Sequence, residues 1–220
     1  RLLEIVWGEE GIRGFRIGDA PAEVQPTSGS LRWPLTGEIY VYWGGNDEAS
    51  NKHHEHLQQQ RALDLAPWTA PDDPTGAREK ATTTTSSTVG RWWRRPRVHM
   101  AIDGIPENEP GRMNAYMIYG NLVVKNHENG EYAYYAHLQP GSITVEVGDR
   151  VKAGHQLGKV GNSGNSSEPH LHFHVQDASD MSRGSGLLPI FEEIRVQRGD
   201  RTQSSPKRYR AEKADIVSPR

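Results

Sequence analysis

The stretch "SEPHLHFHV", residues 167–175, alternates histidines with apolar residues: His170, Leu171, His172, Phe173, His174 and Val175. Successive side chains of a β-strand point to opposite faces of the sheet, so a period of two indicates a strand. The three imidazoles then share one face of the strand, and the three apolar side chains share the other. A one-residue slip in register would exchange the two faces, so burial of the apolar set fixes the direction of the imidazoles.

A row of imidazoles has no use in packing and therefore indicates a binding function. Imidazole nitrogen is a common metal ligand near neutral pH. Same-face neighbours lie about 6.6 Å apart along a strand, which allows two imidazoles to lean toward one point. We expect a metal site on the histidine face and the protein core on the other.

The composition sets limits on the class of protein. The chain has 220 residues, a net charge of −2 and no cysteine. The missing thiols exclude disulfides and thiolate metal sites, and the weak charge gives no reason to expect a nucleic acid or an anionic membrane as partner. The sequence also lacks an apolar run near the roughly 20 residues that span a bilayer.

Short β-branched and aromatic runs separated by turn residues predict an all-β fold. The predicted strands are 38–45, 120–127, 131–138, 143–151 and 155–164. Asn129-Gly130 provides a hairpin turn between the second and third runs. We expect a single antiparallel β-sheet or sandwich domain with an open active-site groove and few short helices. Residues 52–64 are expected to form either a short helix or an irregular segment.

No internal repeat or domain boundary is visible, so we expect one domain over residues 1–220. Its core is expected at about 38–178, with an N-terminal arm at 1–37 and a C-terminal arm at 187–220.

Residues 135–175, "YAHLQPGSITVEVGDRVKAGHQLGKVGNSGNSSEPHLHFHV", resemble the M23 family of zinc metallopeptidases, in a divergent branch. These are lysostaphin- or LytM-type endopeptidases that cut peptidoglycan peptides. The resemblance lies in the "YAHL" strand, the "V-x-x-G-D-x-V-x-x-G" pattern, the "GNSGNSSEPH" turn and the final H-x-H, in the family's order.

The resemblance implies one zinc ion per chain and hydrolysis of peptide bonds by a metal-activated water. The second histidine of H-x-H, His172, is the implied zinc ligand. His170 and His137 are implied to flank the metal as catalytic residues. His174 stands where relatives often carry Glu, and we expect it to orient a neighbouring side chain as a hydrogen-bond donor.

Two further zinc ligands are needed, and the sequence offers two places for them. "HMAID" supplies His99 and Asp103 at the H-x-x-x-D spacing of many relatives. However, only a Pro- and Gly-rich stretch separates Asp103 from Gly120, which leaves no room for the strands expected there.

The second place is "NKHHEHLQQQRALD", residues 51–64, which resembles an N-x-H and "QR-x-A-x-D" segment of the divergent branch. We favour His53 and Asp64 from this match. Because the spacing after Arg61 departs from the branch pattern, His54 and His56 stay open as alternatives to His53.

The leading hypothesis is an endopeptidase with peptidoglycan or another peptide as substrate. The alternative is a non-catalytic M23-like domain that binds a cell-wall partner or peptidoglycan. Such a role implies an exported protein, in the periplasm, at the cell surface or secreted. No signal peptide is visible, and a start at Arg1 rather than Met is compatible with processing or truncation.

Overall fold

The computed structural model describes residues 3–8, 11–17, 24–68, 82–84, 88–89, 95–109, 111–204 and 208–220. Parts of the expected N-terminal arm therefore lie outside the described residues. The described chain forms sixteen strands: β1 (Leu3–Gly8), β2 (Gly11–Ile17), β3 (Ser30–Leu31), β4 (Ile39–Trp43), β5 (Leu63–Pro67), β6 (Thr82–Thr84), β7 (Thr88–Val89), β8 (Arg97–Ile102), β9 (Asn121–Asn126), β10 (Tyr132–Leu138), β11 (Gln156–Lys159), β12 (Leu171–Gln176), β13 (Gly186–Leu187), β14 (Ile194–Arg198), β15 (Arg201–Ser204) and β16 (Ile216–Pro219).

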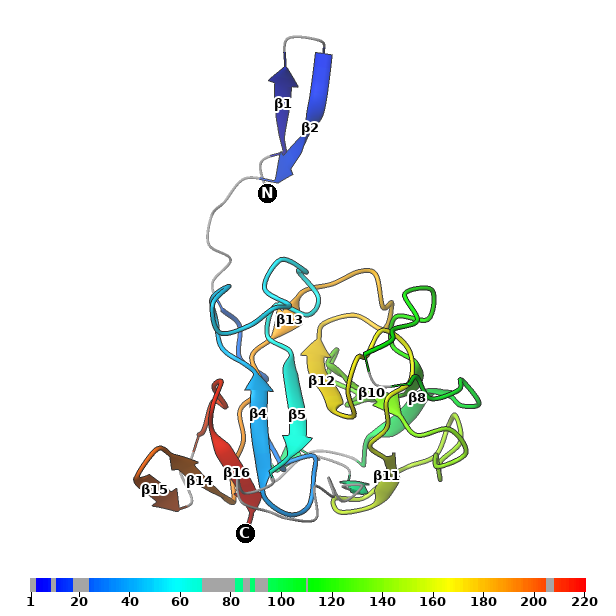
Figure 1. Cartoon of the computed structure of the whole chain (residues 1–220), viewed down its shortest axis with the longest axis vertical. Helices are drawn as coiled ribbons and strands as arrows, with labels where there is room; N and C mark the ends of the chain where they lie inside the picture. The colour runs from blue at the N-terminus through cyan, green and yellow to red at the C-terminus, as the bar shows by residue number, and fades with distance from the viewer. Residues whose placement is uncertain are drawn as a thin grey trace.

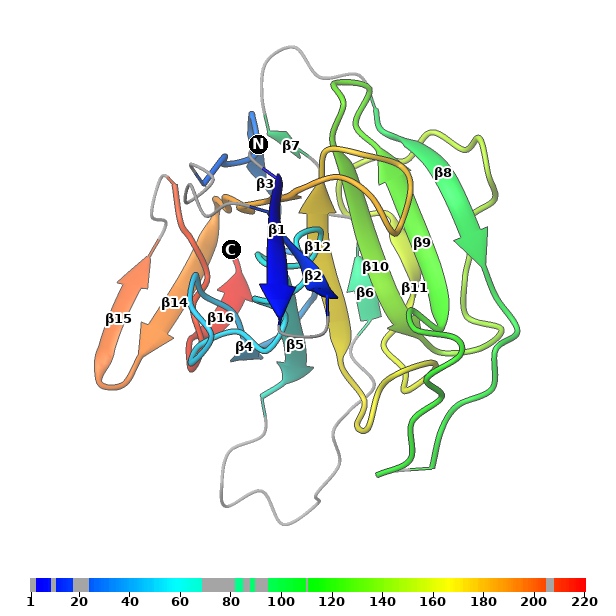
Figure 2. The ribbon, with the colours of Figure 1, turned by 90° about the horizontal axis from the view of Figure 1, so that it is seen from above.

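One antiparallel sheet dominates the described part of the molecule. Its strand order is β15-β14-β16-β4-β5-β12-β10-β9-β8, and β13 pairs with β12 at one side. Figure 2 shows β8, β9 and β10 side by side, and Figures 1 and 2 both show β14 to β16 beyond β4. The predicted all-β class and the antiparallel sheet are confirmed.

The histidine stretch forms a strand in the centre of this sheet. β12 pairs with β10, placing Ala136 opposite His172, and with β5, placing Asp64 opposite His172. The "YAHL" strand and the H-x-H strand are therefore neighbours in the sheet.

The two faces of β12 differ as the alternation predicts. Leu171, Phe173 and Val175 are at most 1% exposed and belong to the main hydrophobic core. This core extends across most of the sheet, from Val98 of β8 to Val196 of β14. Full burial of one such side chain contributes roughly 1.5–3 kcal/mol, which holds the register of β12.

Some local predictions differ from the structure. The described residues contain no helix, and residues 52–61 form turns and a bend, so the irregular alternative holds over this stretch. The predicted strand over 143–151 is wrong. That segment has no strand structure, although Val145 and Val151 are buried. Thr144 links it to β11 through a backbone hydrogen bond of 2.9 Å to Leu157 O and a side-chain hydrogen bond of 2.6 Å to Gln156 O. Residues 194–219, within the expected C-terminal arm, supply three strands of the main sheet.

No described helix is long and apolar enough to cross a membrane.

Candidate metal centre

Three side chains from distant parts of the chain meet beside β12. His53, Asp64 and His172 each offer a ligand atom, and these atoms all lie within 4.8 Å of one another. His53 Nε2 lies 3.1 Å from both carboxylate oxygens of Asp64, and His172 Nδ1 lies 3.0 Å from Oδ1. Asp64 and His172 are buried, and His53 is partly buried.

The loop before β5 holds His53 in place through Asn51. The buried Asn51 amide donates to the carbonyl oxygens of Ala62 at 3.1 Å and of Gly45 and Gln60 at 3.3 Å. Its Oδ1 accepts a hydrogen bond of 3.0 Å from the backbone N–H of His53. The asparagine of the N-x-H motif therefore closes the loop and sets the direction of the histidine two residues later.

The structure places the other two histidines of the 53–56 cluster differently. His54 is partly exposed and His56 is exposed, and neither belongs to the group of described side chains that could together hold a metal ion. His99 is exposed on β8, where its ring contacts Tyr132 at 5.4 Å. Asp103 is exposed and accepts a hydrogen bond of 2.8 Å from Gly141 N, away from the His172 cluster.

A bulge in β10 brings His137 onto the histidine face. The pairing of β10 with β9 shifts between Tyr135 and Leu138, both of which point into the main core. In a regular strand one residue separates two positions on the same face, but two residues, Ala136 and His137, separate Tyr135 from Leu138. The bulge therefore turns the His137 side chain away from the core face. His137 adopts a left-handed φ of 61°, an uncommon backbone conformation outside glycine.

The "GNSG" turn places His137 and His170 side by side. Gly161 N donates to the His137 carbonyl at 3.0 Å, and the Gly161 carbonyl accepts from His170 N at 3.2 Å. A Cβ at Gly161 would lie 2.5 Å from Gln139 N, so only glycine fits there. The two imidazole centroids are 4.8 Å apart, and His137 lies 5.8 Å from His172.

Backbone carbonyls fix the tautomers of both imidazoles. His137 Nδ1 lies 2.8 Å from the Ser163 carbonyl, and His170 Nδ1 lies 2.8 Å from the Glu168 carbonyl. A carbonyl only accepts, so each Nδ1 carries the proton and each Nε2 carries a lone pair. His170 Nε2 is buried without a hydrogen-bond partner among the described residues and lies 3.6 Å from Asp64 Oδ1.

The electrostatics favour neutral imidazoles around an ionised carboxylate. Burial lowers the pKa of His172 to about 3, and it lowers the pKa of His137 well below its usual value. Burial by itself raises the pKa of Asp64, but the surrounding histidines outweigh it, so that the pKa lies well below the usual range. A cluster of neutral imidazoles and one carboxylate is a donor set that zinc accepts.

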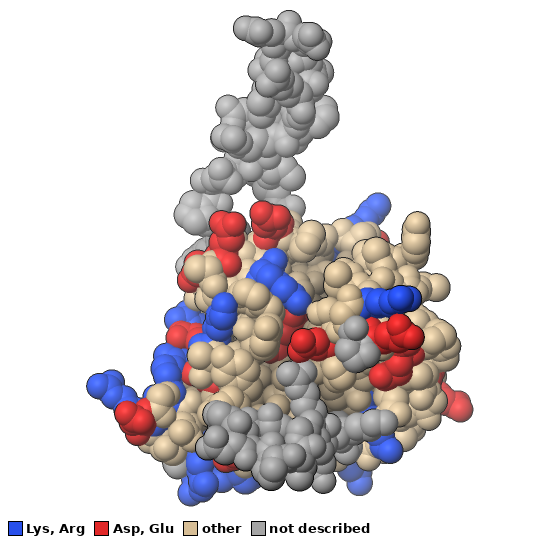
Figure 3. Space-filling view, viewed as in Figure 1, with Lys and Arg blue, Asp and Glu red and all other residues tan. Residues whose placement is uncertain are grey.

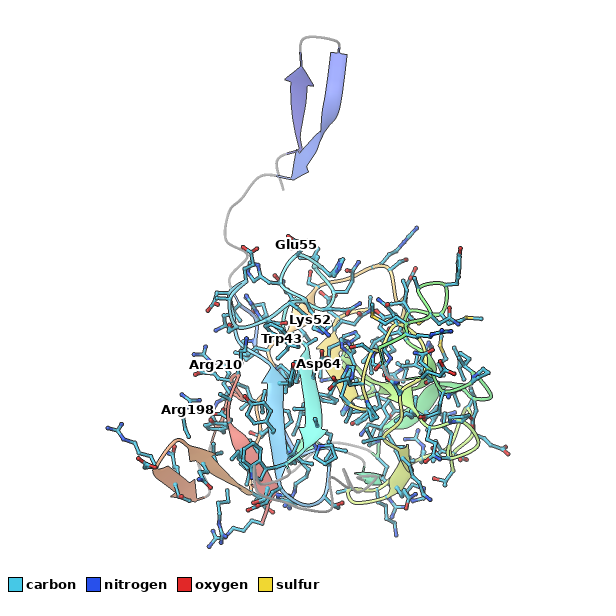
Figure 4. The ribbon with its side chains drawn as sticks, in the orientation of Figure 1. Trp43, Lys52, Glu55, Asp64, Arg198 and Arg210 are labelled. Atoms are coloured by element: carbon cyan, nitrogen blue, oxygen red, sulfur yellow. The ribbon has the colours of Figure 1, made fainter. Side chains whose placement is uncertain are left out.

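Lys52 brings a positive charge to the edge of the cluster. Its Nζ lies 2.8 Å from Asp64 Oδ2, and its side chain is 46% exposed. Figure 4 shows Lys52 next to Asp64 at the start of β5. Both residues line a pocket of about 110 Å³ together with residues 167–170. The rest of the visible face mixes both signs of charge (Figure 3), so Lys52 acts on the site locally.

A family model described as peptidase family M23 matches residues 110–183. The cell division protein DipM of Caulobacter vibrioides is 43% identical over 65 residues, which are 30% of this chain and 10% of that protein. The DD-carboxypeptidase/endopeptidase Mpg of Neisseria meningitidis is 34% identical over 90 residues, which are 36% of this chain and 20% of that protein.

The murein hydrolase activator NlpD of Salmonella dublin is 26% identical over 157 residues, which cover 60% of this chain and 41% of that protein. The chain thus matches less than half the length of these relatives. Among solved structures, the SpoIIIAH–SpoIIQ complex gives a TM-score of 0.44 and 18% identity over 72% of this chain and 96% of that one.

The matched region contains His137, His170 and His172, whereas His53 and Asp64 lie before it. Its residues carry the "YAHL" strand, the "GNSG" turn and the histidine row that predicted the family. Residues 110–183 therefore belong to peptidase family M23.

Proposed function

We propose that this protein is a zinc-dependent endopeptidase that hydrolyses peptide bonds in peptidoglycan cross-links. One observation carries the proposal. The potential ligands His53, Asp64 and His172 gather within 4.8 Å of one another, and His170 directs a buried, unpaired Nε2 at the same carboxylate. An unpaired buried nitrogen in a native site calls for a ligand or water.

The donor atoms of the proposed zinc site are His53 Nε2, Asp64 Oδ1 and His172 Nδ1. Three protein ligands leave the fourth position of a tetrahedral ion open, as in hydrolytic zinc sites. A zinc ion held there supplies a Lewis acid and lowers the pKa of water to near neutral.

His137 and His170 are the proposed proton-handling residues. Each is anchored through Nδ1, so each can take up a proton at Nε2 during attack on the peptide carbonyl. The protonated imidazole then donates to the leaving amine or to the tetrahedral oxyanion. The pocket beside His170 provides access for the peptide.

The proposed substrate places the protein outside the cytoplasm, because peptidoglycan lies there. Relatives named as a cell division protein, an endopeptidase and a murein hydrolase activator support a cell-wall role. We also propose that residues 1–220 act as a single M23-like domain.

The alternative is a non-catalytic domain that binds a cell-wall partner or peptidoglycan. The Lys52–Asp64 ion pair favours it, because an ammonium at 2.8 Å already compensates the carboxylate charge. The match to a murein hydrolase activator points the same way.

One experiment separates the two functions. The protein is stripped with a chelator, reloaded with zinc and incubated with purified cell-wall sacculi, and newly formed amino groups are counted. We expect one zinc per chain and release of amines that stops in the metal-free protein and in His170→Ala. Zinc binding without amine release, or amine release that survives in both controls, would contradict the endopeptidase.

A further inference from the structure

A row of buried polar side chains continues from His172 along the same face of β12. His172 Nε2 lies 3.0 Å from His174 Nδ1, and His174 Nε2 lies 3.2 Å from Gln176 Oε1. The three side chains are between 0 and 2% exposed. Buried polar groups are costly unless they are paired, so this row calls for a consistent assignment of its protons.

The Gln176 amide provides the fixed end of the row. Its Nε2 faces three backbone carbonyls of the following loop, at 2.8 Å from Ala178 O, 2.7 Å from Asp180 O and 3.1 Å from Arg183 O. The opposite orientation would place Oε1, which only accepts, against these three carbonyl oxygens. The amide nitrogen therefore faces the loop, and Oε1 faces His174.

The proton positions follow from that end. Oε1 only accepts, so His174 Nε2 carries a proton, and a neutral His174 then offers a lone pair at Nδ1. His172 in turn donates from Nε2 and keeps its own lone pair at Nδ1. That atom lies 3.0 Å from Asp64 Oδ1, so two lone pairs meet at one point, which suits a divalent cation.

We propose that His174 and Gln176 are positioning residues that set the tautomer of His172, so that its Nδ1 lone pair is directed at the metal. His174 acts as acceptor toward His172 and as donor toward Gln176. The carbonyl oxygens of Ala178, Asp180 and Arg183 orient the Gln176 amide, and through it they influence the tautomer of His172 without contacting it. The inference rests on the proposed zinc site only in taking His172 as a ligand.

Tyr134 holds the middle of the row in place. Its ring stacks on the His174 imidazole with centroids 4.5 Å apart and an interplanar angle of 11°. The Tyr134 hydroxyl accepts a hydrogen bond of 3.1 Å from Gln176 Nε2 and donates to Ser179 O at 2.9 Å. The stacked ring and the anchored amide leave His174 little freedom to turn.

The first test measures the tautomers directly. The metal-free wild-type protein is labelled with ¹⁵N-histidine and examined by NMR at mildly alkaline pH. We expect the proton of His172 on Nε2, with Nδ1 unprotonated, and the proton of His174 on Nε2. A His172 proton on Nδ1 would overturn the inference.

The second test uses two matched variants and measures zinc affinity by competition with a chromophoric chelator. His174→Phe keeps a ring against Tyr134 but removes both hydrogen bonds, and we expect a 10–100-fold weaker affinity, as for other partners of metal ligands. His174→Gln has an oxygen to accept from His172 and a nitrogen to donate to Gln176, so its affinity should stay close to that of the wild type. Equal affinity in all three proteins would contradict the role of His174.

Thermal melts in chelator show whether both variants fold. If His174→Phe does not fold, the tautomer of His172 measured in the wild-type protein decides the question. Neither readout depends on catalysis. A protein with the expected tautomer and zinc affinity that leaves sacculi intact would contradict the endopeptidase and support this inference.

Discussion

Two stretches of this chain carry a histidine followed by an aspartate, and only one of them reaches the histidine row. Asp64 lies on β5, directly opposite His172 in the sheet. Asp103 follows β8, which is separated from β12 by β9 and β10, or about 14 Å at the usual strand spacing. His99 and Asp103 have the sequence spacing of many relatives, but they do not lie beside β12 in the sheet.

The comparison shows that the neighbours of a strand, rather than the spacing of a motif, decide which residues form a site. Asp103 has a different task, since its carboxylate accepts from Gly104 N at 2.7 Å and from Gly141 N at 2.8 Å. It thereby joins two loops at the surface.

The largest expected effect comes from exchanging one carboxylate in each stretch. Asp64→Asn removes the proposed anionic ligand, so zinc affinity should fall by more than the roughly 100-fold typical of losing an outer partner, and activity should vanish. Asp103→Asn should keep zinc and most activity. Zinc content of the purified proteins measures the difference, and a zinc-free Asp103→Asn with a zinc-loaded Asp64→Asn would reverse the assignment.

Next in size are the two histidines with proposed roles in proton transfer. His137→Ala and His170→Ala should each retain zinc but lose about 10²–10⁴-fold in rate, the range for a general acid or base. His99→Ala is the matched control on β8 and should leave the rate unchanged. Steady-state cleavage of a cross-linked peptide provides the measurement. Loss of zinc from His170→Ala would instead make it a ligand.

Asn51 tests how the stretch that carries His53 and Asp64, residues 51–64, is held in place. Asn51→Ala removes its four hydrogen bonds in the loop and leaves buried backbone groups unpaired, which should lower the free energy of unfolding by about 1–3 kcal/mol. Zinc binding should weaken as well, because His53 loses its anchor. Urea unfolding is compared with Asn129→Ala, a partly exposed turn variant that removes two hydrogen bonds and should lower the free energy of unfolding by less. If Asn51→Ala were as stable as the wild type and bound zinc normally, the loop would keep its structure without the Asn51 side chain.

The sequence contained much of the central sheet because β12 has two clearly different faces. Alternation of His172 and His174 with Leu171, Phe173 and Val175 predicted the strand and its buried side. The position of β5 beside β12 could not be derived in this way, because pairing between distant strands leaves no local pattern. Only the family resemblance pointed to Asp64.

The placement of His137 shows a second limit. Regular alternation would put its side chain on the core face with Tyr135, and no glycine or proline marks the bulge that turns it toward His170. Its positive φ depends on hydrogen bonds from distant residues, among them Tyr119 O, which accepts from His137 N at 2.9 Å. Tertiary contacts rather than local preference decide such a conformation.

Burial of the histidine row also predicts how the stability depends on pH. Burial lowers the pKa of His172 and His174 to about 3 from the ordinary 6.5. Between these values the unfolded chain binds more protons than the folded one, so the metal-free protein should lose stability as the pH falls below about 6.5. Each histidine contributes about 1.4 kcal/mol per pH unit within the window. Urea unfolding in chelator measures the slope, and His174→Gln should reduce it, whereas an unchanged slope would contradict the assignment.

Substitution of Lys52 should have the smallest effect, and it tests how a neighbouring positive charge changes zinc affinity at Asp64. The Lys52 ammonium lies 2.8 Å from Asp64 Oδ2, on the oxygen not facing His172, so it repels a cation held by the same carboxylate. Lys52→Met removes that charge and keeps much of the aliphatic stem. Because the lysine is 46% exposed, the gain should stay within about 1 kcal/mol, or roughly 5-fold tighter zinc binding. Lys52→Arg keeps the charge and should bind zinc like the wild type. Chelator competition at two ionic strengths provides the measurement, since added salt should shrink the difference between Lys52→Met and the wild type. If Lys52→Met bound zinc more weakly, the ammonium would instead help to orient the Asp64 carboxylate, and the ion pair would count as a support of the metal site rather than as its competitor.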